Sequence, residues 1–285
     1  IYTAGALTTS LTLIGNNLAA ANGGGIYSGA VLTIVDSTIA DNQAEGGGGL
    51  FDTGSHISTF ERTTISGNLA VGGGGSTLRT QVTHEYLNCT IHGNSATDVG
   101  AGINANGTVN LVNSTVTDNT SESDAPNGGA GLNSFASGTF RLWNTILANN
   151  AVASASTPVV RNCGCTGGSC QPMIQFLSLA NNLEDVDSCF FTGMQDLINT
   201  DPRLRPLGDY GGPTLTRTLE NDSPAIDAGN TGACPDVDQR GLARPIDGDL
   251  DQSALCDIGA VEFDPVIFFD GFETGDTSAW SLTVG

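Results

Sequence analysis

Lysine is absent from this chain of 285 residues, and nine arginines face 30 acidic residues, so the formal net charge is −21. Nucleic acids and anionic membranes are themselves polyanions, so this deficit of positive charge argues against both as partners. No apolar run reaches 18 residues, and we therefore expect no membrane insertion. A signal sequence is also missing from the start, and we expect a mature secreted chain.

Cysteine is scarce before residue 160 and concentrated after it. Close spacing without neighbouring histidine favours disulfides over zinc. One group of four allows three pairings, and a second group has two members: Cys163, Cys165, Cys170 and Cys189, then Cys234 and Cys256. Disulfides predict an oxidising environment, so we expect the protein to be secreted, extracellular or at the cell surface. The seventh cysteine, Cys89, is expected to be a free thiol in the core.

What the chain does contain is a repeated phrase: a small polar residue, Thr, a branched aliphatic residue, two variable residues and Asn. Five near-copies occupy residues 37–42, 63–68, 89–94, 114–119 and 144–149, and weaker copies occupy 17–22 and 177–182. The steps between equivalent asparagines of the five are 26, 26, 25 and 30 residues. Self-similarity at this period predicts a solenoid.

Alternation within the phrase is typical of a strand with one buried face. We expect the aliphatic column to point inward: Ile39, Ile65, Ile91, Val116, Ile146 and Leu179. The threonine column is expected to point outward: Thr38, Thr64, Thr90, Thr115 and Thr145. Each Asn falls where a tight bend needs left-handed geometry or a side chain that bonds the backbone. Stacked Asn amides are expected to bond one another along the axis.

Two more elements recur in each unit. A second inward column contains Ile34, Phe60, Tyr86 and Leu111, and a run of glycines precedes Ile26, Leu50, Ser76, Ile103 and Leu132. Three short strands in a coil of about 25 residues predict an all-β fold, a single-stranded parallel β-helix. Coils are expected over residues 1–200, interrupted by a Cys-rich loop at 162–170. The first coil starts without a covering helix, so we expect upstream residues or a partner at that end.

Residues 200–262 lose the simple repeat but carry a distinctive set of motifs. These are Asp201-Pro202-Arg203-Leu204, Gly211-Gly212-Pro213-Thr214, Ser223-Pro224-Ala225-Ile226-Asp227-Ala228-Gly229, Asp238-Gln239-Arg240-Gly241, Arg244-Pro245 and Cys256-Asp257-Ile258-Gly259-Ala260-Val261-Glu262. In combination this set resembles the choice-of-anchor Q group of bacterial secreted β-helix proteins, which are related to polymorphic outer-membrane-protein repeats. The resemblance implies an extracellular, right-handed β-helix and implies no defined activity.

Beyond residue 200 we expect terminal coils with an acidic, disulfide-pinned loop over 201–262. The tail at 263–285 is interpreted as a cap or an assembly segment, because its aromatic-rich strand could add to a neighbouring molecule. In the acidic loop, carboxylates alternate around a glycine, an arrangement that suits a hard cation. The predicted calcium ligands are Asp247, Asp249, Asp251 and Asp257. The alternative is a solvated acidic turn that binds no cation.

Catalysis has to be weighed because many β-helices are polysaccharide lyases. A lyase needs a base and a group that neutralises the uronate carboxylate. The best candidates are Arg62, Arg79 and His92, and no column of the repeat gathers them convincingly. An ice-binding face would need a second regular threonine column, and the residues at that position are irregular.

The sequence therefore predicts a secreted or cell-surface, non-catalytic β-helix that acts as a structural, adhesive or filament-forming module. Its expected partner is another copy of the chain, bound head to tail, or a surface polysaccharide. The alternative is a calcium-dependent lyase or binder of acidic polysaccharide.

Overall fold

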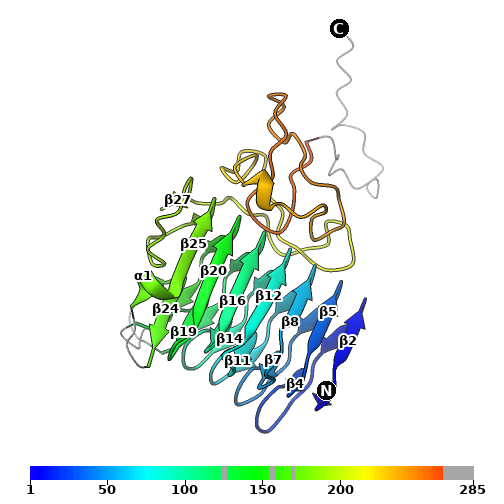
Figure 1. Cartoon of the computed structure of the whole chain (residues 1–285), viewed down its shortest axis with the longest axis vertical. Coiled ribbons are helices and arrows are strands. Elements are labelled where there is room, and N and C mark those ends of the chain that lie inside the picture. The colour runs from blue at the N-terminus through cyan, green and yellow to red at the C-terminus, as the bar shows by residue number, and fades with distance from the viewer. Residues whose placement is uncertain (124–126, 154–157, 168–170, 266–285) are drawn as a thin grey trace.

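Successive repeats stack as coils of a parallel β-helix in the computed structural model (Figure 1). It describes residues 1–123, 127–153, 158–167 and 171–265. Equivalent strands of neighbouring coils pair in parallel and build the sheets, here named A to D. The predicted fold class is confirmed.

Three long sheets run along the stack. Sheet A contains β1 (Tyr2–Thr3), β4 (Ile26–Ser28), β7 (Leu50–Asp52), β11 (Ser76–Leu78), β15 (Ile103–Ala105), β19 (Leu132–Phe135) and β24 (Cys163–Thr166). Sheet B contains β2 (Leu7–Ser10), β5 (Leu32–Val35), β8 (Ser58–Glu61), β12 (Thr83–Leu87), β16 (Thr108–Val112), β20 (Thr139–Trp143) and β25 (Phe176–Ala180). Sheet C contains β3 (Leu13–Gly15), β6 (Thr38–Ala40), β9 (Thr64–Ser66), β13 (Thr90–His92), β17 (Thr115–Thr117), β21 (Ile146–Ala148), β26 (Leu183–Glu184) and β27 (Leu197–Ile198).

A fourth, narrower sheet adds to the three that the sequence predicts. Sheet D contains β10 (Leu69–Ala70), β14 (Ser95–Ala96), β18 (Thr120–Ser121), β22 (Ala151–Val152) and β23 (Val159–Val160), the last pair being antiparallel. Its strands have only two residues each, too short to leave an alternating pattern in the sequence. A short helix, α1 (Pro172–Gln175), and a 3-10 turn, η1 (Thr231–Ala233), complete the described elements.

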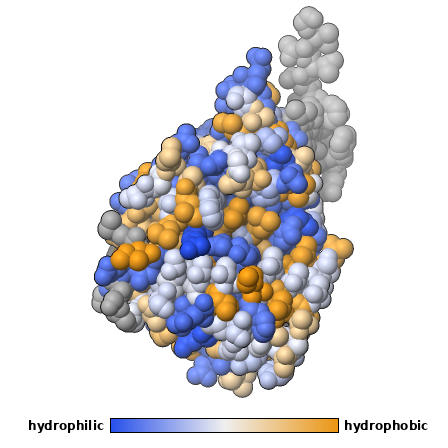
Figure 2. Space-filling view, viewed as in Figure 1, coloured by the Kyte–Doolittle hydropathy of each residue, from blue (hydrophilic) through white to orange (hydrophobic). Residues whose placement is uncertain are grey.

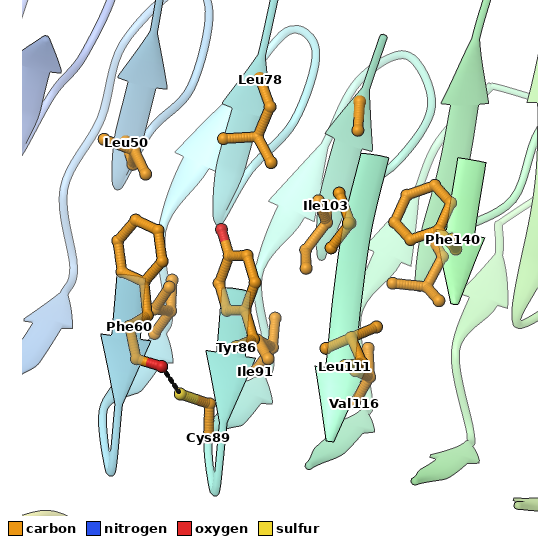
Figure 3. Close-up of a cluster of buried hydrophobic side chains, with 14 of the residues drawn as sticks. Leu50, Phe60, Leu78, Tyr86, Cys89, Ile91, Ile103, Leu111, Val116 and Phe140 are labelled. Atoms are coloured by element: carbon orange, nitrogen blue, oxygen red, sulfur yellow. Dashed lines mark hydrogen bonds between the residues drawn. The ribbon is translucent and has the colours of Figure 1, made fainter. Parts of the chain in front are cut away.

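The core consists of files of side chains, one from each coil. Ile39, Ile65 and Ile91 face one another in register and are fully buried, as predicted. The second file is confirmed as well: Phe60 stacks on Tyr86 with ring centroids 4.6 Å apart (Figure 3). The free thiol of Cys89 lies in this core, 3.4 Å from the Phe60 carbonyl oxygen, and burial raises its pKa to about 12.

An uninterrupted ladder of asparagine amides runs along the axis, as expected. Each Nδ2 donates to the Oδ1 of the asparagine in the next coil at 2.8–3.0 Å, through Asn17, Asn42, Asn68, Asn94, Asn119, Asn150 and Asn162. The left-handed position of the bend belongs to the preceding residue, such as Asp41 or Asp118. The ladder Asn therefore takes the other predicted role and bonds the backbone, as Asn68 does with the Ile39 carbonyl oxygen at 2.9 Å.

The fifth repeat is shifted by one residue from the predicted alignment. Leu147 pairs with Val116 and lies in the inward file, and Asn150 rather than Asn149 joins the ladder. Ile146 consequently faces outward, where Leu183, Leu219 and Ile258 bury it in a second apolar cluster. Two consecutive asparagines made both alignments possible, and the outer cluster stabilises the one observed.

The two weaker copies are also placed differently. The first coil uses Ile14 and Asn17 as its inward and ladder residues, so the predicted copy at 17–22 is wrong. Leu179 lies in β25 of sheet B and is partly exposed, and the inward position next to Leu147 is taken by Glu184.

Glu184 and Asp185 end the asparagine ladder. The Asn162 amide donates to Asp185 Oδ1 at 2.7 Å and to Glu184 Oε1 at 3.3 Å. Ser188 and Cys189 also donate to the Glu184 carboxyl. Burial raises the pKa of Glu184 to about 7, and these hydrogen bonds oppose the rise only in part.

Residues 201–262 do not continue the stack, so the expected terminal coils are not found. Among the described residues the last solenoid strand is β27, and beyond it only isolated antiparallel bridges and η1 occur. Drawn in yellow to orange in Figure 1, this back-folded segment lies along one side of the coils. It reaches the first two coils, because Pro213 lines one small cavity together with Leu11 and Thr38.

Thr38, Thr64, Thr90 and Thr115 form the outward column as predicted, and the back-folded segment covers it. The prediction for Thr145 is wrong: Ile146 pairs with Thr115, and Thr145 Oγ1 donates to the Leu111 carbonyl oxygen at 3.2 Å. Thr64 Oγ1 donates to the Leu215 carbonyl oxygen at 2.5 Å, and Thr115 Oγ1 accepts from the Ala260 amide at 3.1 Å. Gln239 Oε1 accepts from Thr90 Oγ1 at 2.6 Å. The threonines are therefore the docking surface for the segment that lacks the repeat.

Candidate functional site

The motif residues of the back-folded segment meet in one buried ion-pair cluster. Arg244 Nη1 donates to Glu262 Oε1 at 2.6 Å, and both side chains are fully buried. Arg240 Nη2 donates to Asp238 Oδ2 at 2.7 Å, and the same carboxylate oxygen accepts from the Glu262 backbone amide at 3.0 Å. The cluster joins the Asp-Gln-Arg-Gly, Arg-Pro and C-terminal Glu motifs in a single network.

Burial dominates the electrostatics of this cluster. It lowers the pKa of Arg244, and the Glu262 carboxylate opposes that shift by favouring the charged guanidinium. It raises the pKa of Asp257, and the negative charge of Glu262 raises it further. Charges this deep require partners, because a lone buried ion would be strongly destabilising. Most polar atoms of the cluster are hydrogen-bonded to one another, with Arg244 Nε as an exception, and this arrangement suits a structural role.

The acidic loop brings together a set of carboxylates that differs from the predicted one. Asp227, Asp247 and Asp249 each place an oxygen within 4.8 Å of the others. Two of the three were predicted as ligands, and Asp227 was missed because it lies 20 residues upstream of Asp247 in a separate motif. Asp251 is not in this group, and its amide donates to Asp247 Oδ1 at 3.1 Å.

Backbone amides already occupy much of this oxygen surface. Asp227 Oδ2 accepts from Gly248 and Asp249, at 2.8 and 2.9 Å. The carboxylates therefore explain the loop conformation by themselves, and calcium stays a prediction.

Asp257 lies away from the loop carboxylates. Its Oδ1 accepts from the Asp227 amide at 2.7 Å, and its Oδ2 accepts from the Phe263 amide at 2.5 Å. The side chain is fully buried beneath the loop. Asp257 therefore has a structural role between the loop and the ion-pair cluster and is not part of the carboxylate group of Asp227, Asp247 and Asp249, and its role as a calcium ligand stays a prediction.

The three candidate lyase residues belong to three separate places on the coils. Arg62, between β8 and β9, is held by Asp36 Oδ1 at 2.7 Å and by Glu61, and the Asp36 bond is the main cause of its raised pKa. Arg79 follows β11 of sheet A, with its guanidinium carbon 4.6 Å from the Phe135 ring centroid. His92 lies in sheet C, where Nδ1 is 3.4 Å from Asp118 Oδ2.

Asp118 is shared between His92 and the back-folded segment. Arg217 forms an ion pair with it across 99 residues of sequence. Burial opposes ionisation of Asp118, but hydrogen bonds from His92 and Thr117 and the charge of Arg217 outweigh burial and lower its pKa. Asp118 thus helps to hold the segment on the coils through Arg217, and His92 contacts the same carboxylate.

A buried Asp–His pair inside the solenoid was not predicted. His84 Nε2 lies 3.1 Å from Asp52 Oδ2, which also accepts from Ser58 Oγ at 3.2 Å, and all three side chains are fully buried. The same carboxylate oxygen takes both contacts, and no hydrogen bond joins His84 to Ser58 among the described residues, although the two are paired on neighbouring strands. We interpret the group as a structural one, in which buried polar side chains bond one another inside the core.

Two disulfides are described. Cys234–Cys256 confirms the predicted second pair, and Cys163–Cys189 resolves part of the first group. Cys165 is also disulfide-bonded, and Cys170 lies outside the described residues. The first bond joins β24 to the last coil, and the second fastens η1 to the motif that carries Asp257. Both therefore close the C-terminal part of the fold.

An open groove crosses the outer face of sheet A and has a volume of about 590 Å³. Its floor contains the outward residues Thr77 and Asn104, and its walls include Phe51 and Phe135. The groove was not predicted from the sequence. One sequence pattern could have indicated it. In two successive coils an aromatic residue, Tyr27 or Phe51, follows the Gly–aliphatic pair, and in the next coil the equivalent residue is the smaller Thr77.

Comparisons with family models, curated proteins and solved structures gave no match to the chain. The resemblance to the choice-of-anchor Q group therefore stays a prediction, although the motifs that carry it now have a defined structural role. None of the helices in the described part of the chain is long and apolar enough to cross a membrane.

Proposed function

We propose that the protein is a secreted or cell-surface, non-catalytic β-helix that serves as a rigid adhesive scaffold. The proposal depends mainly on one observation: residues that could take part in catalysis instead contact other parts of the protein. Arg62, His92 and the motif residues of the back-folded segment all bind other parts of the fold. These contacts hold the fold together. Of the three candidate lyase residues only Arg79 lines the sheet A groove, and no histidine belongs to that lining.

The surface and the disulfides support the extracellular part of the proposal. Hydrophobic and hydrophilic residues are intermingled over the face viewed in Figure 2, without one continuous apolar area. Disulfides at both ends of the C-terminal half favour an oxidising compartment. A rigid, highly charged solenoid of this kind presents many outward side chains in fixed rows, which is what an adhesive module needs.

Adhesion and catalysis can be separated with the same preparation. Beads coated with the protein should attach to bacterial or host cells more than beads coated with an unrelated protein. Uronate polymers incubated with the protein should show no rise in the absorbance of unsaturated sugars. Lyase activity that is lost in Arg79→Ala would replace this proposal by the enzyme alternative. Failure of the beads to attach to any cell type would remove the adhesive role.

Self-assembly is a second candidate, and the first coil favours it. β1, β2 and β3 form the edges of sheets A, B and C, and Leu11, Leu13 and Leu18 beside them are 75, 69 and 77% exposed. An edge with such residues accepts a further layer of strands. That layer could be upstream residues of a longer chain or the end of another copy. The predicted assembly tail at 263–285 lies almost wholly outside the described residues.

Light scattering and negative-stain images test assembly directly. Head-to-tail association predicts filaments whose length grows with concentration, because such a contact does not close on itself. Leu11→Lys together with Leu13→Lys should shorten them, while Leu250→Lys, which alters an exposed leucine on the back-folded segment, should not. A monodisperse monomer at all concentrations would reject this candidate.

A further inference from the structure

The groove on sheet A begins where a ladder of aromatic rings stops. Tyr2, Tyr27 and Phe51 stack along the outside of the first three coils, with ring centroids 5.3 and 5.6 Å apart. The next two outward positions in the same column are Thr77 and Asn104. The ring of Phe51 therefore has an aromatic neighbour on one side and the groove on the other.

A second aromatic wall stands at the other end. Phe135 lies in β19, three strands after β7, and Arg79 packs on its ring. Neighbouring strands are spaced by about 4.8 Å, so the interval corresponds to roughly 14 Å along the stack. That length accommodates about two to three sugar rings.

The floor between the walls carries a hydrogen-bond donor that has no partner of its own. Asn104 is only 9% exposed, and its Oδ1 accepts from Asn133 Nδ2 at 2.9 Å. Its Nδ2 has no hydrogen-bond partner among the described residues and faces open space towards Gly72, where an added Cβ would lie 3.9 Å away. The amide nitrogen is therefore a donor that a ligand in the groove can reach.

The charges of the groove define the ligand further. Glu45 and Asp98 line it, and their carboxylates form no ion pair in the described chain; Arg79 is the only basic residue in the lining. Two carboxylates against one guanidinium disfavour a polyanion, which the net charge of −21 also repels. Carboxylates, amides and hydroxyls are good partners for sugar hydroxyls, and aromatic rings pack on the apolar faces of sugar rings.

From this arrangement we propose that the sheet A groove binds a neutral oligosaccharide, with Phe51 and Phe135 packing on sugar rings and Asn104 donating to a hydroxyl. A peptide is a poorer fit. Strand addition needs a free sheet edge, and every strand under the groove from β7 to β19 is paired on both sides. The inference rests on the proposed adhesive function and names its ligand class: the expected surface polysaccharide is neutral, in contrast to the acidic polysaccharide of the alternative function.

Titration of the whole protein with cellohexaose, xylohexaose, mannohexaose and hexagalacturonate tests the proposal. At least one neutral hexasaccharide should bind with a Kd of millimolar or lower, and hexagalacturonate should not. Phe51→Ala and Asn104→Ala should each weaken binding about tenfold, and Tyr2→Ala, an aromatic of the same ladder outside the groove, should not. Thermal melting of each variant checks that it is folded.

The failures are distinct. The glycan proposal is overturned if none of the neutral hexasaccharides binds, or if wild type and Phe51→Ala bind equally well. It is also overturned if the protein prefers hexagalacturonate or an extended peptide. If beads adhere to cells equally with wild type and Phe51→Ala, adhesion stands and the groove is not its cause. If the groove binds a neutral glycan but beads attach to no cell, the groove stands and the adhesive function fails.

Discussion

The side-chain amide of Gln239 joins two neighbouring coils of the solenoid. Its Nε2 donates to Thr64 Oγ1 at 2.9 Å, and its Oε1 accepts from Thr90 Oγ1 at 2.6 Å. The two contacts span 175 and 149 residues of sequence, and Gln239 is fully buried. One glutamine thus bonds two threonines that are 26 residues apart, and this double contact fixes the position of the back-folded segment on the threonine column.

Replacing this amide should loosen the segment without dissolving the coils. Gln239→Leu keeps most of the volume but leaves the buried Thr90 hydroxyl without its partner and removes the bond to Thr64, so we expect a loss of about 2 kcal/mol in the free energy of unfolding. Limited proteolysis should cut within 201–262 faster than in wild type. Gln252→Leu, in an exposed loop, is the matched control. Equal stability of the two variants would contradict the docking role of Gln239.

The Arg244–Glu262 pair should behave as a buried ion pair. Arg244→Met alone leaves an unpaired buried carboxylate and should cost about 3–5 kcal/mol in the free energy of unfolding. The double variant with Glu262→Leu should recover much of this loss, because both charges are then removed. Arg203→Met breaks the exposed Arg203–Asp222 pair and should change stability by less than about 1 kcal/mol. Urea denaturation of the four proteins measures these values, and a harmless Arg244→Met would refute the buried network.

Glu184 should make the end of the stack sensitive to pH. Its pKa is raised from 4.5 to about 7, mainly by burial, so the folded protein binds the proton more tightly than the unfolded chain. The resulting stabilisation is complete below pH 4.5 and is lost as the pH rises towards 7. Its size should be on the order of 1–3 kcal/mol.

Glu184→Gln isolates this contribution from the other carboxyls. Asp257 and Glu262 also have raised pKa values, which add a slope of the same sign, and the lowered pKa of Asp118 adds one of opposite sign. The difference in Tm between wild type and Glu184→Gln should therefore grow, in favour of the variant, from pH 4.5 to pH 7. Glu122→Gln, at an exposed position, should show no such trend. Parallel Tm curves for wild type and Glu184→Gln would contradict the account.

The calcium hypothesis makes a separate prediction for the acidic loop. Calcium should raise the Tm of the chelator-treated protein, and Asp249→Ala or Asp227→Ala should abolish the increase because each removes an oxygen ligand from the group. Asp209→Ala, in another exposed loop, should retain it. A Tm that is indifferent to both chelator and calcium would remove the site.

Local repetition explains why the coils could be predicted from the sequence. The inward files through Ile39, Ile65 and Ile91 and the asparagine ladder depend on residues that recur at nearly constant spacing, so each repeat supports the next. The predicted alignment of the fifth repeat is wrong by one residue, because Asn149 and Asn150 are adjacent and either could have been the ladder residue. The choice between them depends on Ile146, which faces outward only because Leu219 and Ile258 cover it.

The rest of the fold depends on contacts that no period reveals. Gln239 meets the threonine column through two hydrogen bonds and Ala260 through one, each across about half of the chain or more. Asp227 joins the acidic loop from a different motif, and the groove exists because Thr77 and Asn104 are smaller than the aromatic residues that precede them in their column. The repeat identified the threonine column but not the segment that covers it.

Hydrogen exchange of the peptide over residues 256–262 tests the central claim, that the segment without the repeat is docked on the outward threonines. The Gly259 amide donates to the Asn144 carbonyl oxygen at 2.8 Å and the Ala260 amide to Thr115 Oγ1 at 3.1 Å. The account predicts that this peptide exchanges as slowly as the core strand Thr90–His92 and much faster in Thr115→Val. Complete exchange of the wild-type peptide within seconds would contradict it.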